Sequence, residues 1–158
     1  ADLIREELNY LLLTGQTDAA LANFDKAIAN DPENPAMFYN RGLIKDQIGD
    51  QKAAAEDYNK ALQYDPTFFD AAYNLGAMFY NTGVEWNNKA SGYSLDETTK
   101  YKEASNKANE FFALAKPALE KAHEIDPKDR NTIASLIKIY AIEGDDAKYL
   151  EMKKKLDK

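Results

Sequence analysis

Residues 35–68 read PAMFYNRGLIKDQIGDQKAAAEDYNKALQYDPTF, and this stretch holds the pattern that decides the fold. Its Gly49 and Pro66 recur at steps of 34 residues, in Gly15, Gly49 and Gly83 and in Pro32 and Pro66. The pattern resumes at Pro127 and Gly144, each 61 residues after its predecessor, which is one period plus a 27-residue insertion. A fixed period of this length indicates stacked supersecondary units, because one such unit cannot bury its apolar face alone.

Each period is predicted to form two helices. Within 17–30 the apolar residues recur at three- and four-residue steps, as an amphipathic helix requires. An Asp-Pro pair ends the second helix of each period, because proline disfavours helical geometry in the residue before it. Pro35 after Asn34 is typical of a helix start with its cap. The sequence therefore predicts an all-α chain, with helices at about 2–13, 17–30, 35–48, 51–64, 69–90, 95–125, 129–142 and 145–157.

Small and aromatic residues keep the same phase in successive periods. The equivalent residues are Gly42 and Gly76; Ala20, Ala54 and Ala115; Phe24, Tyr58 and Leu119; Ala27, Ala61 and Ala122. They resemble the tetratricopeptide repeat (TPR), over the whole chain except the insertion. The resemblance implies a single domain, a right-handed TPR-type helical solenoid of about four helix-turn-helix repeats and eight helices. The repeats would be 1–34, 35–68, 69–128 with an insertion near 84–110, and 129–158.

The insertion lengthens the third repeat. Ser94-Leu95-Asp96-Glu97 fits a capping box, in which Ser94 accepts a hydrogen bond from the third amide and Glu97 returns one. The turn is therefore predicted near 91–93, and Gly83 is expected inside a long helix at some cost in helix propensity. Roughly 13 extra residues in each helix lengthen the hairpin by about 18–20 Å. Some bacterial TPR proteins, often exported ones, are similar in this lengthened hairpin.

Three aromatic residues, Trp86, Tyr93 and Tyr101, are expected near the tip of this hairpin. They either fill its seam, which has no other core, or form a contact surface for a partner or a second copy of the chain. The chain begins at Ala1 inside a predicted helix, so either a leader has been removed or the chain is a fragment of a longer one. Two locations therefore stay open, the periplasm after export and the cytoplasm.

In TPR proteins the first helix of each repeat lines a concave groove that holds an extended peptide. The resemblance implies these groove residues: Arg5, Asn9, Tyr39, Asn40, Leu43, Asp46, Asp70, Tyr73, Asn74, Ala77 and Asn81. Asparagine amides both donate and accept hydrogen bonds, and tyrosines offer rigid contact area with a polar tip. The alternative is that the asparagines only steady the scaffold.

Some TPR co-chaperones hold the acidic C-terminal tails of chaperones in a clamp for two carboxylates. Its pattern is a basic residue, two asparagines and then two further basic residues, and Arg5, Asn9 and Asn40 match the first three positions. The last two positions hold Asp70 and Asn74. Because an acid at that position repels the carboxylate of the tail, a chaperone tail is not the expected partner.

The 158 residues include 27 acids and 20 bases, for a formal net charge of −7. The whole excess lies in residues 1–80, which favours a neutral or basic partner segment. The alternative is a solvated acidic surface that keeps the chain soluble. Nucleic acid is not an expected partner, because phosphate contacts need clustered Lys and Arg. No apolar run approaches the roughly 20 residues of a membrane span, so membrane insertion is not expected.

No enzyme, cofactor or metal site is predicted. The chain has no cysteine and one histidine, His123, near a helix C-terminus, where histidine interacts favourably with the helix dipole. Adjacent carboxylates such as Glu6 and Glu7 diverge around a helix and cannot converge on a reacting atom. The sequence therefore indicates a non-enzymatic module that binds another protein or peptide segment. Two alternatives stay open: self-association as a homodimer through the hairpin, and a regulatory part of a longer protein.

Overall fold

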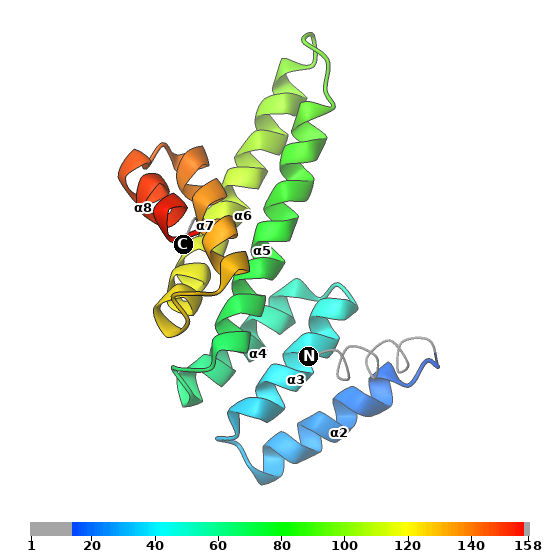
Figure 1. Ribbon diagram of the computed structural model, residues 1–158. Coiled ribbons are helices and arrows are strands. Elements are labelled where there is room, and N and C mark those ends of the chain that lie inside the picture. The colour runs from blue at the N-terminus through cyan, green and yellow to red at the C-terminus, as the bar shows by residue number, and fades with distance from the viewer. Residues whose placement is uncertain (1–13, 157–158) are drawn as a thin grey trace. The chain divides into compact units, whose positions relative to one another are not determined.

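The computed structural model describes residues 14–156, and within them every regular element is an α-helix (Figure 1). The helices are α2 (Thr17–Asn30), α3 (Pro35–Gln47), α4 (Gln51–Tyr64), α5 (Phe69–Ser91), α6 (Thr98–Ile125), α7 (Arg130–Glu143) and α8 (Asp146–Leu156). The all-α prediction is confirmed, and these helices begin and end within one residue of the predicted bounds except at the start of α6. The helix predicted over 2–13 lies outside the described residues.

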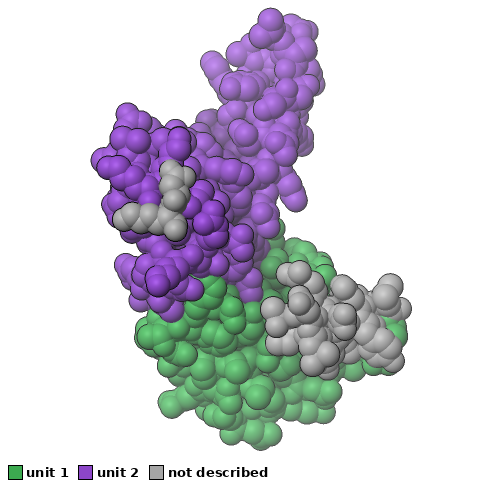
Figure 2. Space-filling view, viewed as in Figure 1, with its two compact units in different colours: residues 1–71 green, residues 72–158 purple. Residues whose placement is uncertain are grey.

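The chain divides into two compact units, residues 1–71 and residues 72–158 (Figure 2). The division falls in the first turn of α5. The described part of the first unit is therefore α2, α3, α4 and the start of α5, and the second unit contains the rest of α5 with α6, α7 and α8. None of the helices in residues 14–156 has the length and apolar character needed to cross a lipid bilayer.

Two of the periodic glycines, Gly49 and Gly144, separate consecutive helices of the described residues. Gly15, Gly49 and Gly144 have φ angles of 67°, 83° and 72°, a left-handed conformation that favours glycine at the end of a helix. Gly83 has the same phase but lies inside α5, as the insertion predicts. The turn of this repeat follows Ser91 instead.

Side-chain caps set the starts of α3 and α4. Asn34 accepts a hydrogen bond from the backbone N–H of Ala36 at 3.1 Å, directly before Pro35. Asp50 accepts one from the backbone N–H of Ala53, also at 3.1 Å. Each cap satisfies a backbone donor that the first turn of the helix leaves unpaired.

In the first unit, α3 packs closely against α4. A Cβ atom at Gly42 would lie 3.0 Å from the ring of Tyr58, so only a small residue permits this approach. Tyr58 is completely buried. One buried cluster among the described residues of this unit is Phe38, Ala61 and Ala71, flanked by Ile28, Tyr39, Leu62, Tyr64 and Phe68.

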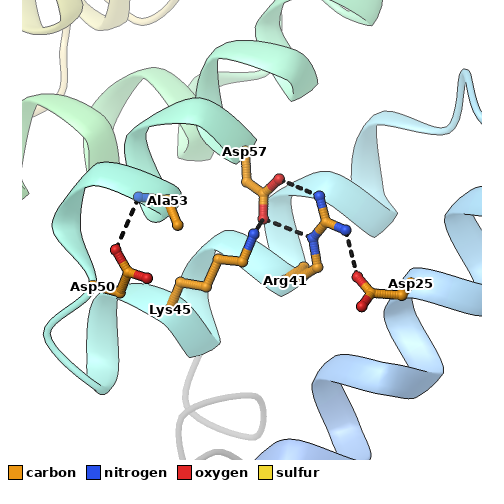
Figure 3. Close-up of polar contacts among 6 residues, drawn as sticks. All are labelled: Asp25, Arg41, Lys45, Asp50, Ala53 and Asp57. Atoms are coloured by element: carbon orange, nitrogen blue, oxygen red, sulfur yellow. Dashed lines mark hydrogen bonds and ion pairs between the residues drawn. The ribbon is translucent and has the colours of Figure 1, made fainter.

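An ion network joins α2, α3 and α4 (Figure 3). The Asp57 side chain is 3% exposed and accepts hydrogen bonds from Arg41 Nε at 2.8 Å and Nη2 at 2.5 Å. Lys45 Nζ lies 2.8 Å from Asp57 Oδ2, and Arg41 Nη1 donates to Asp25 of α2 at 2.6 Å. The bond to Asp57 is the main cause that raises the pKa of Arg41, although partial burial opposes it. The planar guanidinium thus fixes α3 to both neighbouring helices.

In the second unit, α5 and α6 are the longest described helices, with 23 and 28 residues, and they run antiparallel (Figure 1). The ring centroids of Tyr80 and Phe112 are 5.7 Å apart, and those of Phe79 and Phe111 are 6.4 Å apart. A Cβ atom at Gly83 would lie 2.7 Å from the Phe112 ring. The helix-weakening glycine therefore permits the close approach of the two helices.

The predicted capping box forms only in part, and α6 begins at Thr98 rather than at Leu95. The backbone N–H of Ser94 donates to Glu97 Oε2 at 3.3 Å, as the box requires. The Ser94 hydroxyl, however, lies 2.7 Å from an Asp96 carboxylate oxygen and 3.0 Å from Glu97 Oε2. The hydroxyl donates its proton to a carboxylate, and the start of α6 has no side-chain cap hydrogen bond among the described residues. The prediction that Ser94 caps the helix is wrong.

Helices α7 and α8 pack with α6 around a large buried cluster of the second unit. Its members are Ala108, Phe112, Ala115, Leu119, Ile133, Leu136, Ile139, Tyr140 and Met152. Glu120 of α6 accepts hydrogen bonds from Tyr140 Oη of α7 at 2.7 Å and from Lys148 Nζ of α8 at 2.9 Å. Partial burial alone would raise the pKa of Glu120, but these two bonds, together with the charges of Lys148 and Lys116, outweigh burial and lower the pKa. The carboxylate thus ties three helices together.

Candidate functional site

Four of the expected groove residues lie on α3 of the first unit, namely Tyr39, Asn40, Leu43 and Asp46, and all four are half-buried. The Tyr39 ring lies 4.9 Å from the Phe68 ring and 6.0 Å from the Tyr58 ring. Tyr39 is therefore partly committed to the packing of its own unit. The remaining three residues form a mixed surface with an amide, an apolar group and an acid.

Asn40 is the residue of α3 with the most unused hydrogen-bonding capacity. Its side chain forms no hydrogen bond with any described residue. An amide has two donor hydrogens and an acceptor oxygen, and a half-buried one gains from a partner that uses them. Its arrangement suits an incoming backbone, which presents both N–H and C=O groups.

Asp46 gives the same surface an acidic end. Burial raises the pKa of this carboxyl, although the nearby Tyr58 hydroxyl opposes the shift. Burial and the charge of Asp46 raise the pKa of Tyr58 in turn, and the buried Tyr58 hydroxyl has no hydrogen bond of good geometry among the described residues. Asp46 is thus a partly desolvated negative charge, which favours a cationic or donor group beside it.

Five further expected groove residues lie on one face of α5. Asp70 and Asn81 are exposed, whereas Tyr73, Asn74 and Ala77 are half-buried. Their spacing of three and four residues places them in line along the helix. The Asn81 side chain, like that of Asn40, has no hydrogen bond within residues 14–156. Asp70 belongs to the first unit and the other four residues to the second.

Two expected site residues, Arg5 and Asn9, lie outside the described residues. The three aromatic residues expected at the hairpin differ in their surroundings. Trp86 packs at the edge of the buried cluster of the second unit, with Lys89 Nζ and Lys107 Nζ 4.6 Å and 4.3 Å from its ring centroid. Tyr93 is half-buried and Tyr101 is 49% exposed.

Sequence reasoning missed two surface features. Leu95, in the loop of the hairpin, is fully exposed. An open cleft of about 550 Å³ in the first unit is lined by Phe38, Arg41, Glu56, Asp57, Asn59, Lys60 and Gln63. Arg41 and Asp57 are joined at its edge by their ion pair. Neither feature follows from periodicity, because both depend on how side chains from separate segments are placed.

The geometry agrees with a sequence comparison. Residues 9–49 and 46–83 match the TPR repeat family. The chain is a TPR protein. Together the matched segments cover residues 9–83, and the helices that follow extend the same helix-pair pattern through α8.

Solved structures of similar fold span almost the whole TPR chain. A crystal structure of MamA has a TM-score of 0.62 at 19% identity and covers 98% of this chain and 75% of that one. The structure of TTC0263, a thermophilic TPR protein of Thermus thermophilus, has a TM-score of 0.57 at 17% identity and covers 98% and 72%. At this identity the likeness concerns the fold alone.

Two curated relatives share more of the sequence. The photosystem I assembly protein Ycf3 of Acaryochloris marina is 29% identical over 127 residues, covering 78% of this chain and 69% of that protein. The TPR and J domain-containing co-chaperone DNJ1 of Fusarium oxysporum is 33% identical over 84 residues, covering 53% of this chain. The present chain spans 16% of DNJ1.

The TPR fold bears on the chemistry of the site. TPR homologues are in general scaffolds or co-chaperones without enzymatic activity. Within residues 14–156, no three His, Cys, Asp or Glu side chains are grouped so that they could hold a metal ion.

Proposed function

We propose that this TPR protein binds an extended segment of another protein through the first helices of its repeats, with α3 and α5 as the main contacts. TPR proteins in general mediate protein–protein interactions. The names of two similar proteins describe roles that involve other proteins, namely an assembly protein and a co-chaperone. The family supports protein binding in general. Contact through α3 and α5 is the specific proposal, and it is argued from the residues on these two helices.

Asn40 and Asn81 carry the proposal. Each amide lies on a first helix of a repeat without a side-chain hydrogen bond to any described residue. An extended peptide has unpaired N–H and C=O groups that an amide can satisfy at once. Each such bond contributes about 0.5–1.5 kcal/mol to binding.

The charge of these surfaces favours a neutral or basic segment. Asp46 on α3 and Asp70 on α5 are the acids of the expected groove set, and the surplus negative charge lies in residues 1–80. Oppositely charged surfaces accelerate association, and salt screens this attraction. The affinity for the partner is therefore expected to fall as the salt concentration rises.

Site-specific photo-crosslinking tests the proposal. A photoreactive amino acid replaces Asn40 or Asn81, and matched controls carry it at Asn59 of α4 or Asn109 of α6, both exposed. We expect one partner protein to crosslink from positions 40 and 81 and not from positions 59 and 109. With the partner purified, Asn40→Ala with Asn81→Ala is expected to weaken binding roughly 5- to 150-fold.

Two results would contradict the specific proposal. One is a partner that crosslinks equally from the control positions. The other is full affinity of the double variant with its helical circular dichroism unchanged. Either result would leave protein binding possible and place it on another surface.

Self-association is a second candidate, favoured by the exposed apolar groups of the hairpin. Leu95 is fully exposed and Tyr101 is 49% exposed, and both belong to the segment that joins and begins the long helices. Light scattering over a concentration series tests it. A dimer population that falls with Leu95→Ser and Tyr101→Ser, but not with Asn109→Ser, would support it, and a monomer at all concentrations would rule it out.

A further inference from the structure

His123, the single histidine of the chain, lies near the end of α6 and contacts α8. Its Nε2 atom lies 2.9 Å from Lys155 Nζ. An ammonium group can only donate, so this contact is a hydrogen bond only while Nε2 carries no proton. The contact with Lys155 therefore requires the neutral imidazole, with its proton on Nδ1.

The surroundings of the His123 ring disfavour its charged form, the imidazolium. Nδ1 is buried and has no hydrogen-bond partner among the described residues. A charged ring would need an acceptor for each of its two N–H groups. Here one N–H would have no acceptor and the other would point at an ammonium group.

Three charged groups act on the ring. Lys155 and Glu151 belong to α8, and Asp126 directly follows α6; α7 places no charged group of the described residues against the ring. Burial and Lys155 lower the pKa of His123, and the opposing effects of Glu151 and Asp126 are smaller. Glu151 also pairs with Lys155 at 3.0 Å, so it holds the lysine in place and partly compensates its charge.

We propose that His123 and Lys155 form a proton-sensitive latch that holds α8 on α6 at neutral pH and loosens it in mildly acidic solution. Uptake of one proton from solvent at Nε2 removes the acceptor of the Lys155 hydrogen bond. It also leaves two cations at hydrogen-bond distance, which repel each other. The bond that holds the helix thus becomes a repulsion.

Loosening α8 would uncover apolar surface. Met152 of α8 is buried in the cluster of the second unit, and Tyr149 and Leu156 pack against that cluster. Weakening the attachment of α8 exposes these side chains and the parts of α6 and α7 that they cover. The latch therefore links pH to an apolar surface at the C-terminal end of the second unit.

The direction of the pH dependence follows from linkage. The ordinary pKa of histidine is about 6.5, and the folded chain holds His123 below it. Between the two values the unfolded or detached state binds more protons than the attached state. The contribution of neutral His123 to the attachment of α8 is therefore complete above about pH 6.5. It is lost as the pH falls through that value toward the pKa of His123 in the folded chain.

Proton NMR reads the latch directly, because one histidine gives one set of imidazole signals. We expect the signals of the full chain to titrate with a midpoint below that of free histidine. Lys155→Met should move the midpoint upward, and Glu151→Gln should move it further down. Lys154→Met is the matched control, because Lys154 is exposed and has no described partner, and it should leave the midpoint unchanged. A midpoint at or above that of free histidine, or no upward shift in Lys155→Met, would overturn the proposal.

Hydrogen exchange measures the consequence. In the native chain, the amides of α8 should lose protection between about pH 7.5 and about pH 5.5, after correction for intrinsic exchange rates, while those of α4 keep it. His123→Gln offers Lys155 an amide oxygen that does not titrate, so this variant should keep its α8 protection at the lower pH. If the α8 amides of His123→Gln lose as much protection at the lower pH as those of the native chain, another group controls the attachment of α8. If that variant fails to fold, the NMR titrations still decide the question.

Discussion

At the scale of a residue, Asp46 shows how an acid expected in a binding surface can oppose stability. Its carboxylate is half-buried in the last turn of α3, at the negative end of the helix dipole. Burial raises its pKa, which means that the folded state disfavours the charge. Asp70 lies in the first turn of α5, where a negative charge is favourable. Two acids expected on the same face thus have opposite effects on folding.

We predict that Asp46→Asn raises the urea midpoint of unfolding at pH 7. The folded state binds more protons at Asp46 than the unfolded state, so the cost of this charge is present at neutral pH and disappears as the pH falls through the folded pKa. The gain should therefore shrink on acidification. Asp70→Asn, the matched control, should lower the midpoint slightly. Equal effects of the two substitutions would contradict the assignment of the cost to burial of Asp46.

At the scale of an element, the α5–α6 hairpin depends on glycines inside a helix. Glycine weakens a helix interior by about 1 kcal/mol relative to alanine. A Cβ atom at Gly83 would nevertheless lie 2.7 Å from the Phe112 ring, and one at Gly76 would lie 2.6 Å from the Leu119 side chain. Close contact between the two long helices therefore outweighs helix propensity at both positions.

We predict that Gly83→Ala destabilises the chain by about 1–3 kcal/mol, because overpacking exceeds the gain in propensity. Adding Phe112→Leu should recover part of the loss, since the ring that the methyl group meets is gone. Asn87→Ala, on an exposed position of α5, should be neutral or slightly stabilising. Denaturant unfolding measures all three. A stabilising Gly83→Ala would show that the helices can separate at no cost.

At the scale of the whole molecule, different kinds of interaction stabilise the two compact units. The first unit has a buried carboxylate, Asp57, held by Arg41 and Lys45, with Asp25 as an exposed fourth member. The second has an apolar cluster formed by α6, α7 and α8, and Glu120 ties these three helices together. In repeat proteins each unit contacts only its neighbours, so damage to one is expected to stay local.

We predict that Asp57→Asn destabilises the first unit by about 3–5 kcal/mol, because it leaves two partly buried cations without their anion. Asp25→Asn, at a side chain that is 63% exposed, should cost about 1 kcal/mol or less. Hydrogen exchange should show protection lost in α2, α3 and α4 and retained in α7 and α8. An equal loss in both units would mean that they unfold as one.

Local signals account for what could be predicted. Pro35, Gly49 and Gly144 act through their own backbone geometry, so the helix bounds around them were predicted to within one residue. The predicted start of α6 was wrong because residues 95–96 form a turn closed by the Glu97 N–H on the Ser94 carbonyl, a tertiary detail that the box pattern does not contain. The roles of Asn40 and Asn81 on the expected binding face stay predictions.

By itself, the sequence determined that the chain is all-helical, where its turns lie, and that it repeats with a TPR period, because these depend on residues close together in the chain. Only the tertiary structure decided that Arg41 is shared between Asp57 and Asp25, that Gly83 lies against Phe112, and that His123 lies against Lys155. These contacts join residues 16 to 32 positions apart. Their existence depends on how whole helices pack, and packing is set by the combined shape of many side chains.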